Sequence, residues 1–522
     1  MVKWRKFAKS LWQRGSIALA TAALLLASVG NPATGWSSAT VHATTTTTWH
    51  VMVGNGSPHM RVDGMQYFPG VITIDAGDTV VWTLAGAEPH TVSFLGGAPP
   101  PVPGSPASEQ PVGGSIYTGQ GEVSSGLLLP IPGHNQYQLT FPNPGVYSYR
   151  CLLHPNQQGV VIVNPAGTPY PQTAAQYAAE GQAEWQATLN TANAAQAAVH
   201  PTVTAGPNGH AVIHAFMDAP QPPDVSAPLT AANNSGVSGT AVLSLLGPTT
   251  VKVEVTASGL AAGSTHAVEI RPGDCQTVGA PLYTLPPITA NAQGQATLTT
   301  TLSPVDGIAA AGWVVDILSS TSASSTPTQS FAACGAVSGQ VYALMRYEPN
   351  PLVIHVGDEV IWTQANLEEI HTVTFLAAGQ APPAFPSPQA INPAGGSVYT
   401  GSGYVNSGIL APFQSYHLVF AKSGIYPYLC TLHDEMGMDG TVEIRAPGVP
   451  LTHAVFFLTH HPVGWYGPGN ISLQRAADAL WQTSSPYSVF ALSHRPVGAL
   501  GAAAITLQRD ADLLWLGGIP RK

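Results

Sequence analysis

Cysteine, histidine and methionine side chains gather near residue 430 in a pattern that suits a metal ion. Cys430, His433 and Met438 offer a thiolate, an imidazole and a thioether within nine residues. These soft donors select copper over harder cations. His371 begins a stretch of alternating apolar residues that predicts a strand, and it supplies a second imidazole. Two His, one Cys and a long axial Met are typical of a blue-copper electron-transfer site.

The same pattern occurs earlier in the chain. His90, Cys151 and His154 repeat the order and the Cys–His spacing of the second set. The match continues through the loops, where residues 113–126 resemble residues 395–408. A repeat of this length indicates a duplicated domain, and chance core packing of Cys and His does not explain it.

The spacing Cys-x2-His-x4-Met, followed by x-Gly-x-Val and preceded by a distant His, resembles the cupredoxin family, plastocyanin in particular. In that family the axial ligand generally precedes x-Gly-x-Val. The resemblance therefore makes Met438 the axial ligand of the second site and places Met436 at its hydrophobic rim. In the first domain the same slot holds Gln157, with a shorter spacing that resembles amicyanin and an amide donor that resembles stellacyanin.

The two predicted sites are therefore not equivalent. An amide oxygen is a harder ligand than a thioether and stabilises Cu(II) relative to Cu(I), so we expect the first site to have the lower potential. The alternative is a first site that has lost copper binding, although it keeps Cys151, His154 and His90.

In the families resembled, the edge of the loop histidine is where electrons enter and leave. We therefore expect exposed edges of His154 and His433 to be the electron ports. Pro155, Leu432 and Met436 would then form an apolar patch for a brief encounter with a redox protein partner.

Two classes of enzyme also contain cupredoxin domains, namely multicopper oxidases and copper nitrite reductases. Both need further His ligands, commonly directly before the loop Cys. Arg150 and Leu429 stand there in this chain. The sequence thus favours an electron carrier over an enzyme. A copper-storing or cell-surface structural protein is a further alternative, which copper binding without reversible redox cycling would favour.

Composition and charge indicate an exported set of β domains. Only 8% of the 522 residues are charged and 44% are hydrophobic, with 54 Gly and 47 Pro, which suits turn-rich domains with real cores. Residues 1–43 combine basic residues, the apolar run 17–29 and a small-residue cleavage context, as secretory signals do. The run is short for a membrane span of about 20 residues, so we expect cleavage rather than a membrane anchor.

Cleavage would leave 12 basic against 27 acidic residues. A mature chain with a formal charge of about −15 argues against nucleic acid as a partner. The expected location is outside the cytoplasm, secreted or at the cell surface.

Four cysteines fall into two pairs. Cys151 and Cys430 belong to the predicted copper sites, which leaves Cys275 and Cys334 as a plausible disulfide of an exported protein. The competing pairing joins Cys151 to Cys430.

The central region resembles sandwich domains related to copper–zinc superoxide dismutase and to chordin-type modules. The similarity lies in residues 259–275 and 332–335. Dismutases carry a His-x-His pair where this chain has Glu269 and Arg271, so the resemblance implies a structural module without a metal. His266 is expected at the surface, at a strand end.

The expected fold class is mainly all-β, with two cupredoxin Greek-key β-sandwiches flanking a central β-sandwich. An Ala-rich helix is predicted over 174–199, and the C-terminal region repeats, with amphipathic helices over 471–481 and 505–515. The predicted divisions are a signal peptide 1–43, cupredoxin domain 48–165, helical linker 166–207, β-sandwich 208–338, cupredoxin domain 339–446 and tandem repeat 447–522.

Overall fold

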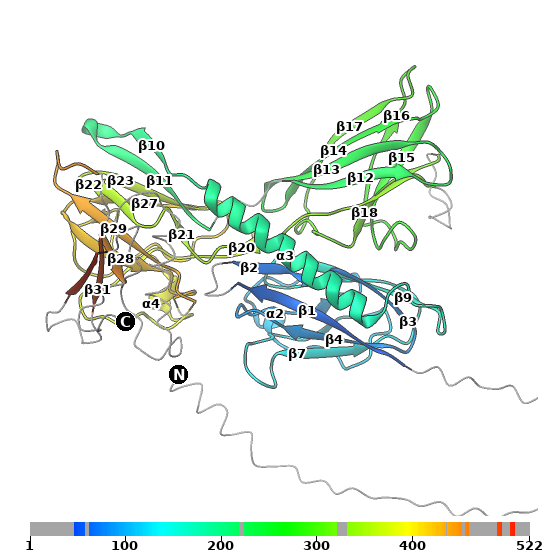
Figure 1. Cartoon of the computed structure of the whole chain (residues 1–522), viewed down its shortest axis with the longest axis horizontal. Coiled ribbons are helices and arrows are strands. Elements are labelled where there is room, and N and C mark those ends of the chain that lie inside the picture. The colour runs from blue at the N-terminus through cyan, green and yellow to red at the C-terminus, as the bar shows by residue number, and fades with distance from the viewer. Residues whose placement is uncertain are drawn as a thin grey trace, which may run out of the picture. The chain divides into compact units, whose positions relative to one another are not determined.

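The structure is a computed structural model of the chain. It describes residues 46–57, 62–218, 224–320, 331–434, 436–451, 455–458, 488–492 and 502–506. The signal peptide predicted over 1–43 lies outside these residues. The described part is mainly β-strand, as predicted, with one long helix (Figure 1).

The first duplicated domain consists of two sheets that share one core. Trp82 and Phe94, one from each sheet, are fully buried with ring centroids 5.8 Å apart. Strand β4 alternates half-buried and buried residues, which is the period-2 pattern of a strand with one face on a core. The elements are β1 (Thr48–Gly56), β2 (Asp63–Phe68), β4 (Thr79–Leu84) and β7 (Gln136–Thr140) in one sheet, β3 (Val71–Asp75), β5 (Ser93–Phe94), β6 (Val123–Ser124), β8 (Gly145–Arg150) and β9 (Gln158–Asn164) in the other, and the short helix α2 (Pro106–Glu109).

The second duplicated domain repeats this arrangement around Trp362 and Phe375. Its elements are β10 (Thr202–Ala205), β11 (Ala211–Met217), β21 (Tyr347–Glu348), β23 (Glu359–Gln364), β25 (Val398–Tyr399) and β27 (Ser415–Phe420) in one sheet, β22 (Leu352–His355), β24 (Thr374–Phe375), β26 (Val405–Asn406), β28 (Gly424–Leu429) and β29 (Asp439–Arg445) in the other, and helix α4 (Pro388–Ile391).

Strand β11, together with its neighbour β10, is separated in sequence from the rest of its sheet. It falls inside the range 208–338 predicted for the central sandwich, yet it pairs in parallel with β23, as β1 pairs with β4. The central sandwich therefore lies in sequence between the first two strands of the second duplicated domain, β10 and β11, and its remaining strands. The sequence assigned this segment to the central region because neighbouring residues in a chain do not show which sheet a strand joins.

The central region is an eight-stranded sheet system with its own core. Its strands are β12 (Asp224–Ala231), β13 (Ser238–Gly247), β14 (Thr250–Ser258), β15 (Thr265–Pro272), β16 (Tyr283–Thr289), β17 (Ala296–Leu302), β18 (Trp313–Leu318) and β19 (Phe331–Ala336). The 3-10 turn η2 (Pro207–Gly209) joins β10 to β11 of the second duplicated domain.

Two predictions about the central region have clear outcomes. The Cys275–Cys334 disulfide is present, and Cys151 and Cys430 are free, so the competing pairing is wrong. His266 is buried rather than at the surface, because Ser264 and the Leu318 carbonyl satisfy its two ring nitrogens.

Glu269 and Arg271 belong to a buried ion-pair cluster. Arg271 contacts the carboxylates of both Glu269 and Asp316, and all three side chains are buried. The guanidinium thus occupies the space next to Glu269 with a fixed positive charge, which does not suit a cation site.

Helix α3 (Ala174–Ala198) lies along the first duplicated domain (Figure 1). It begins with a capping box between Thr173 and Gln176, and Trp185 packs against Phe68 with ring centroids 6.0 Å apart. Gly181 permits the approach, because a Cβ there would lie 2.7 Å from the Phe68 carbonyl carbon. The helix therefore packs on this domain rather than acting as a free linker.

The two duplicated domains contact each other through β2 and β20 (Tyr342–Ala343). Asp63 pairs with Ala343 in an antiparallel bridge, and Met65 is buried in the core cluster of the second domain. The contact brings together the ends of the domains that carry the predicted metal ligands.

In the C-terminal region the structure describes three strands, β30 (Val455–Leu458), β31 (Ser488–Leu492) and β32 (Ala502–Thr506). The helix predicted over 505–515 is wrong at its first two residues, which continue β32. The remainder of that helix and the one predicted over 471–481 lie outside the described residues.

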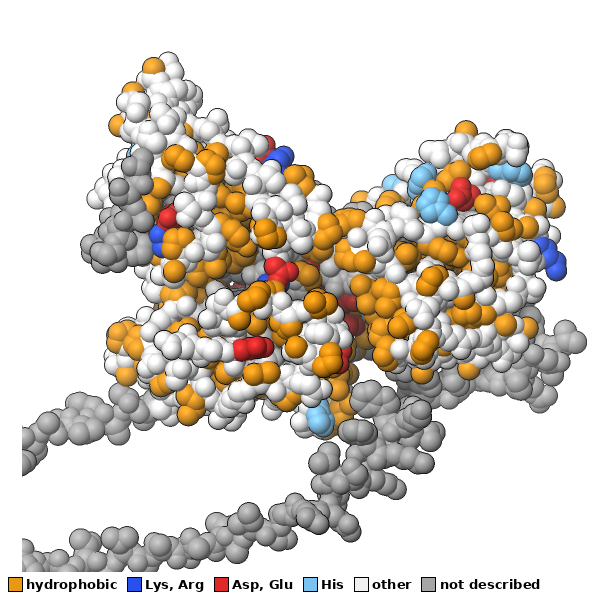
Figure 2. Space-filling model, turned by 180° about the vertical axis from the view of Figure 1, so that it is seen from behind, with side chains coloured by type: hydrophobic (Ala, Val, Ile, Leu, Met, Phe, Trp, Pro, Cys, Tyr) orange, Lys and Arg blue, Asp and Glu red, His pale blue; other side chains and the backbone are white. Residues whose placement is uncertain are grey.

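Charged side chains are sparse on the surface. Figure 2 shows a face on which hydrophobic and uncharged polar side chains predominate and charged groups are scattered. Among the helices that the structure describes, none has the length and apolar character to span a membrane.

Candidate metal centres

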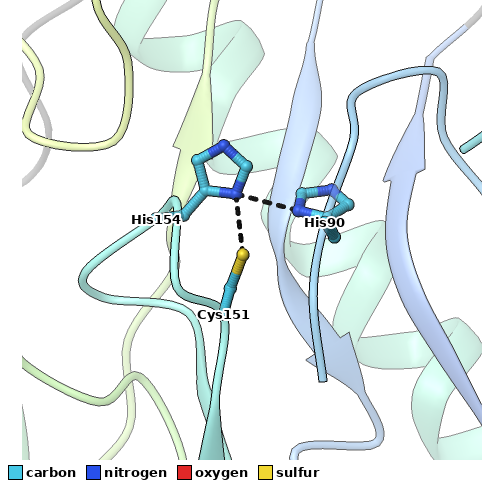
Figure 3. Close-up of side chains that lie close together, drawn as sticks. All are labelled: His90, Cys151 and His154. Carbon is cyan, nitrogen blue, oxygen red and sulfur yellow. Dashed lines mark hydrogen bonds between the residues drawn. The ribbon is translucent and has the colours of Figure 1, made fainter. Parts of the chain in front are cut away.

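The first predicted metal site is assembled from two chain segments (Figure 3). His90 precedes β5, and Cys151 and His154 lie in the loop between β8 and β9. The two Nδ1 atoms of the histidines are 2.9 Å apart, and Cys151 Sγ lies 3.4 Å from His154 Nδ1. Ligands about 2.0–2.3 Å from one transition-metal ion are separated by distances of this size.

The second predicted site has the same construction. His371 precedes β24, and Cys430 and His433 lie between β28 and β29. The His371 and His433 Nδ1 atoms are 3.0 Å apart, and Cys430 Sγ is 3.9 Å and 3.7 Å from them. All six side chains of the two sites are buried. The structure therefore brings together the two histidines and the cysteine of each predicted site.

Each cysteine is poised as a thiolate. Burial alone raises the pKa of the Cys430 thiol, but the neighbouring His433 and His371 outweigh it and hold that pKa well below its usual range. The pKa of Cys151 is held low in the same way by His154 and His90. The thiolate is the form that binds metals. A backbone N–H, from Thr372 in the second site, also donates to the sulfur at 3.4 Å.

The backbone places Gln157 and Met438 at equivalent positions. Cys151 N donates to Gln157 O at 2.9 Å, and Cys430 N donates to Met438 O at 3.0 Å. The amide nitrogen of Gln157 donates to Gln66 O, which leaves its Oε1 facing His154 Nδ1 at 3.3 Å. The oxygen, rather than the nitrogen, of Gln157 is thus presented to the site.

Met438 is fully buried in the core of its domain, while Met436 is half-buried at its edge. Met438 N donates to His433 O at 3.0 Å, so the residue closes the ligand loop. This placement agrees with an axial role for Met438 and a rim position for Met436.

Comparison with known proteins gives the same family for the second domain. Residues 334–445 match the family of copper binding proteins described as plastocyanin/azurin. They form a cupredoxin-like domain. Amicyanin from Paracoccus denitrificans is 29% identical over 111 residues, or 21% of this chain and 68% of that protein. Amicyanin from Paracoccus versutus is 29% identical over 102 residues, or 20% of this chain and 61% of that protein.

Solved structures of cupredoxins are also similar. A mutant plastocyanin of fern is 26% identical, with 22% of this chain and 99% of that chain covered and a TM-score of 0.15. The oxidised plastocyanin from Dryopteris crassirhizoma is 25% identical, and the match covers 22% of this chain and 99% of that chain with a TM-score of 0.15. Each of these matches covers 22% of this chain.

The first histidine of each site has a different neighbour in the two domains. Val51 lies opposite Trp82, and Ala215 lies opposite Trp362. Gly54 follows Val51 by three residues, and Asp218 follows Ala215 by three residues. Both have a left-handed backbone, with φ of 58° for Gly54 and 67° for Asp218. They are therefore equivalent positions.

In the first domain the ring of His90 packs directly on Gly54, where a Cβ would lie 2.3 Å from Nε2. In the cupredoxin-like domain Asp218 Oδ2 lies 3.9 Å from His371 Nε2. Burial lowers the pKa of both histidines, but contacts with Asp218 and Cys430 reverse this effect and raise the pKa of His371.

The loop histidines are not the exposed electron ports that the sequence suggested. His154 is 2% exposed and His433 is 0% exposed. Their Nε2 edges point into the contact between the two duplicated domains, at 3.2 Å and 3.4 Å from the two carboxylate oxygens of Glu369. The prediction was wrong because the contact between the two domains covers these edges, which the spacing of residues within one domain does not reveal.

Further carboxylates surround this contact. Glu88 Oε2 lies 3.9 Å from His433 Nε2, and Glu368 accepts a hydrogen bond from Asn156 N at 3.3 Å. Burial, above all, raises the pKa of Asp63 to about 7 and of Glu88 and Glu368 to about 8. Burial would also raise the pKa of Glu369, but its contacts with the two histidines lower it below its usual range.

Sequence reasoning missed the residues next to the ligands. Glu88 and Glu369 each stand two positions before the first histidine of their own domain, and that repeated position was a usable signal. No comparable signal marked Asp218, because its relation to His371 depends on β11 joining the sheet of β23.

Proposed function

We propose that this protein is an exported electron carrier with two blue-copper centres. The observation that carries the proposal is the presence of two buried His–Cys–His clusters in which both imidazole Nδ1 atoms and the cysteine sulfur converge. Copper bound there would supply a reversible one-electron couple, and the thiolate, imidazole and thioether or amide donors fit it.

The residues that would hold copper are those predicted from the sequence. His90, Cys151, His154 and Gln157 form the first site; His371, Cys430, His433 and Met438 form the second. Buried, preformed ligands held by backbone hydrogen bonds change little when the charge of a bound ion changes, which favours electron transfer over bond-making chemistry.

Export and the class of partner belong to the same proposal. The composition of residues 1–43 supports secretion, and the Cys275–Cys334 disulfide is typical of an oxidising compartment. The partners would be redox proteins outside the cytoplasm, which dock away from the loop histidines because those edges are covered.

The test is copper stoichiometry and the visible spectrum of the mature protein and of its Cys151→Ser and Cys430→Ser variants. We expect two coppers in the wild type and one in each variant, with the loss of one intense thiolate-to-copper band each time. The Cys275→Ser and Cys334→Ser double variant is the matched control and keeps both coppers.

Other outcomes separate the alternatives. One copper, lost only in Cys430→Ser, would reduce the proposal to a single centre. Absence of any thiolate band would refute it, and a copper that binds but does not cycle between oxidation states would favour a storage or structural role.

A further inference from the structure

The two metal clusters are linked by one side chain. Glu369, in the cupredoxin-like domain, is 4% exposed and places Oε1 3.2 Å from His154 Nε2 and Oε2 3.4 Å from His433 Nε2. His154 belongs to the first domain and His433 to the second. A single carboxylate therefore lies between the loop histidines of both clusters.

The tautomers required for metal binding fit this contact. In both clusters the Nδ1 atoms face the cysteine sulfur, so Nδ1 must be the unprotonated, ligating nitrogen. A neutral imidazole that ligates through Nδ1 carries its proton on Nε2. That N–H then points at Glu369 in each case. Metal-bound histidines commonly give their second N–H to a carboxylate, which fixes the ring and increases its basicity.

Glu88 is the residue of the first domain that corresponds to Glu369, and its contacts differ. Glu88 stands two residues before His90, as Glu369 stands two residues before His371. Glu88 lies 3.9 Å from His433 and thus faces the site of the other domain. Both carboxylates act across the domain contact, but Glu369 touches two loop histidines, whereas the short contact of Glu88 is with His433.

We propose that Glu369 is a shared positioning residue that orients the loop histidines of both metal sites, so that the first site is complete only when the second domain is packed against it. This inference rests on the proposed copper sites. It goes beyond them because it makes metal binding in one domain depend on a residue of the other. The nearest cause of the dependence is the 3.2 Å contact between His154 Nε2 and Glu369 Oε1.

The consequence for the bound metal follows from charge. A carboxylate acceptor makes the imidazole a stronger donor and stabilises the more highly charged oxidation state. Glutamine at this position keeps the shape and one acceptor oxygen but removes the negative charge. Both sites should then bind copper(II) more weakly and have higher reduction potentials.

The experiment isolates each site in the full-length mature chain. Glu369→Gln is introduced into the Cys430→Ser background, where copper(II) and cobalt(II) titrations report on the first site, and into the Cys151→Ser background, where they report on the second. We expect affinity to fall about 10- to 100-fold in both backgrounds. Glu88→Gln should reduce affinity in the Cys151→Ser background and leave the Cys430→Ser background unchanged.

Glu359→Gln is the control, since Glu359 lies in the same domain and pairs with His417 away from both sites. Two further measurements separate this role from a loss of packing. They are the reduction potentials of the two single-site proteins and the 15N chemical shifts of the histidine rings in the metal-free chain. A loss of packing alone would not change these quantities at both loop histidines together. Glu369→Asp is the conservative variant and should restore part of the affinity.

The outcomes are distinct. If the Cys430→Ser protein binds copper and Glu369→Gln leaves its affinity and potential unchanged, the shared role of Glu369 is overturned while the proposed function stands. If neither single-site protein binds copper with Glu369 intact, the proposed function fails.

Discussion

The two duplicated domains hold the same two His and one Cys in the same fold, yet they differ in what touches those ligands. The residue whose carbonyl accepts the cysteine N–H is Gln157 in one and Met438 in the other, and the position beside the first histidine is Gly54 in one and Asp218 in the other. The pair shows how duplication can preserve ligands while changing their electrostatic surroundings. The differences all lie one contact away from the two histidines and the cysteine.

The largest effect is expected at Gly54. Gly54→Ala should destabilise the first domain by about 2–4 kcal/mol, because the added Cβ would overlap His90 and the left-handed backbone disfavours a side chain. Displacement of His90 should also weaken copper binding at the first site by at least about 100-fold. Urea unfolding and copper titration in the Cys430→Ser background measure the two effects.

Gly104→Ala is the matched control for Gly54→Ala. Gly104 has φ of 73°, and a Cβ there would meet nothing within 4 Å. It should cost about 1 kcal/mol through the backbone and leave copper binding intact. Equal copper affinity in Gly54→Ala and Gly104→Ala would mean that His90 is not a ligand.

The next largest effect is expected when Gln157 and Met438 are each replaced by the residue of the other domain. Gln157→Met should raise the potential of the first site, and Met438→Gln should lower that of the second, each by at least about 59 mV, which corresponds to a tenfold change in preference between the two oxidation states. Potentials of the single-site proteins measure this by spectroelectrochemistry. Shifts of the same sign in both variants would contradict an axial role for these residues.

The smallest effect concerns the helix that packs on the first domain. Glu184 in α3 accepts a hydrogen bond from Gly70 N at 3.1 Å, and burial raises its pKa from 4.5 to about 7. The folded state therefore binds this proton more tightly than the unfolded state, so stability is highest at low pH and falls as pH rises from about 4.5 to 7. Glu184→Gln should reduce that fall by on the order of 1–2 kcal/mol, discounted for partial exposure.

Amide hydrogen exchange measures this change locally. Wild type and Glu184→Gln are compared at pH 5 and pH 8 in β3, which follows Gly70, and in β22 of the second domain. We expect the pH-dependent difference in β3 and none in β22. An equal change in both strands would show that α3 does not act on the first domain specifically.

Much of the fold and of the ligand sets could be read from the sequence. Cys151 and His154, and Cys430 and His433, are three residues apart, so each pair needs only one loop to bring it together. The long helix was predictable from its Ala-rich run. The burial of His266 was not, because a strand-end histidine has the same sequence signature whether or not a neighbouring carbonyl reaches it.

The sequence by itself determined that two copies of one pattern of His and Cys residues exist, because local spacing and a repeat are properties of the chain. The tertiary structure decided that β11 belongs with β23, that Asp218 lies beside His371 and that Glu369 lies between His154 and His433. His154 and Glu369 are more than 200 residues apart, and no periodicity or spacing relates them. Their contact exists because the two domains bury their ligand-bearing ends against each other, and the buried Nε2 of His154 then requires a polar partner from the opposite domain.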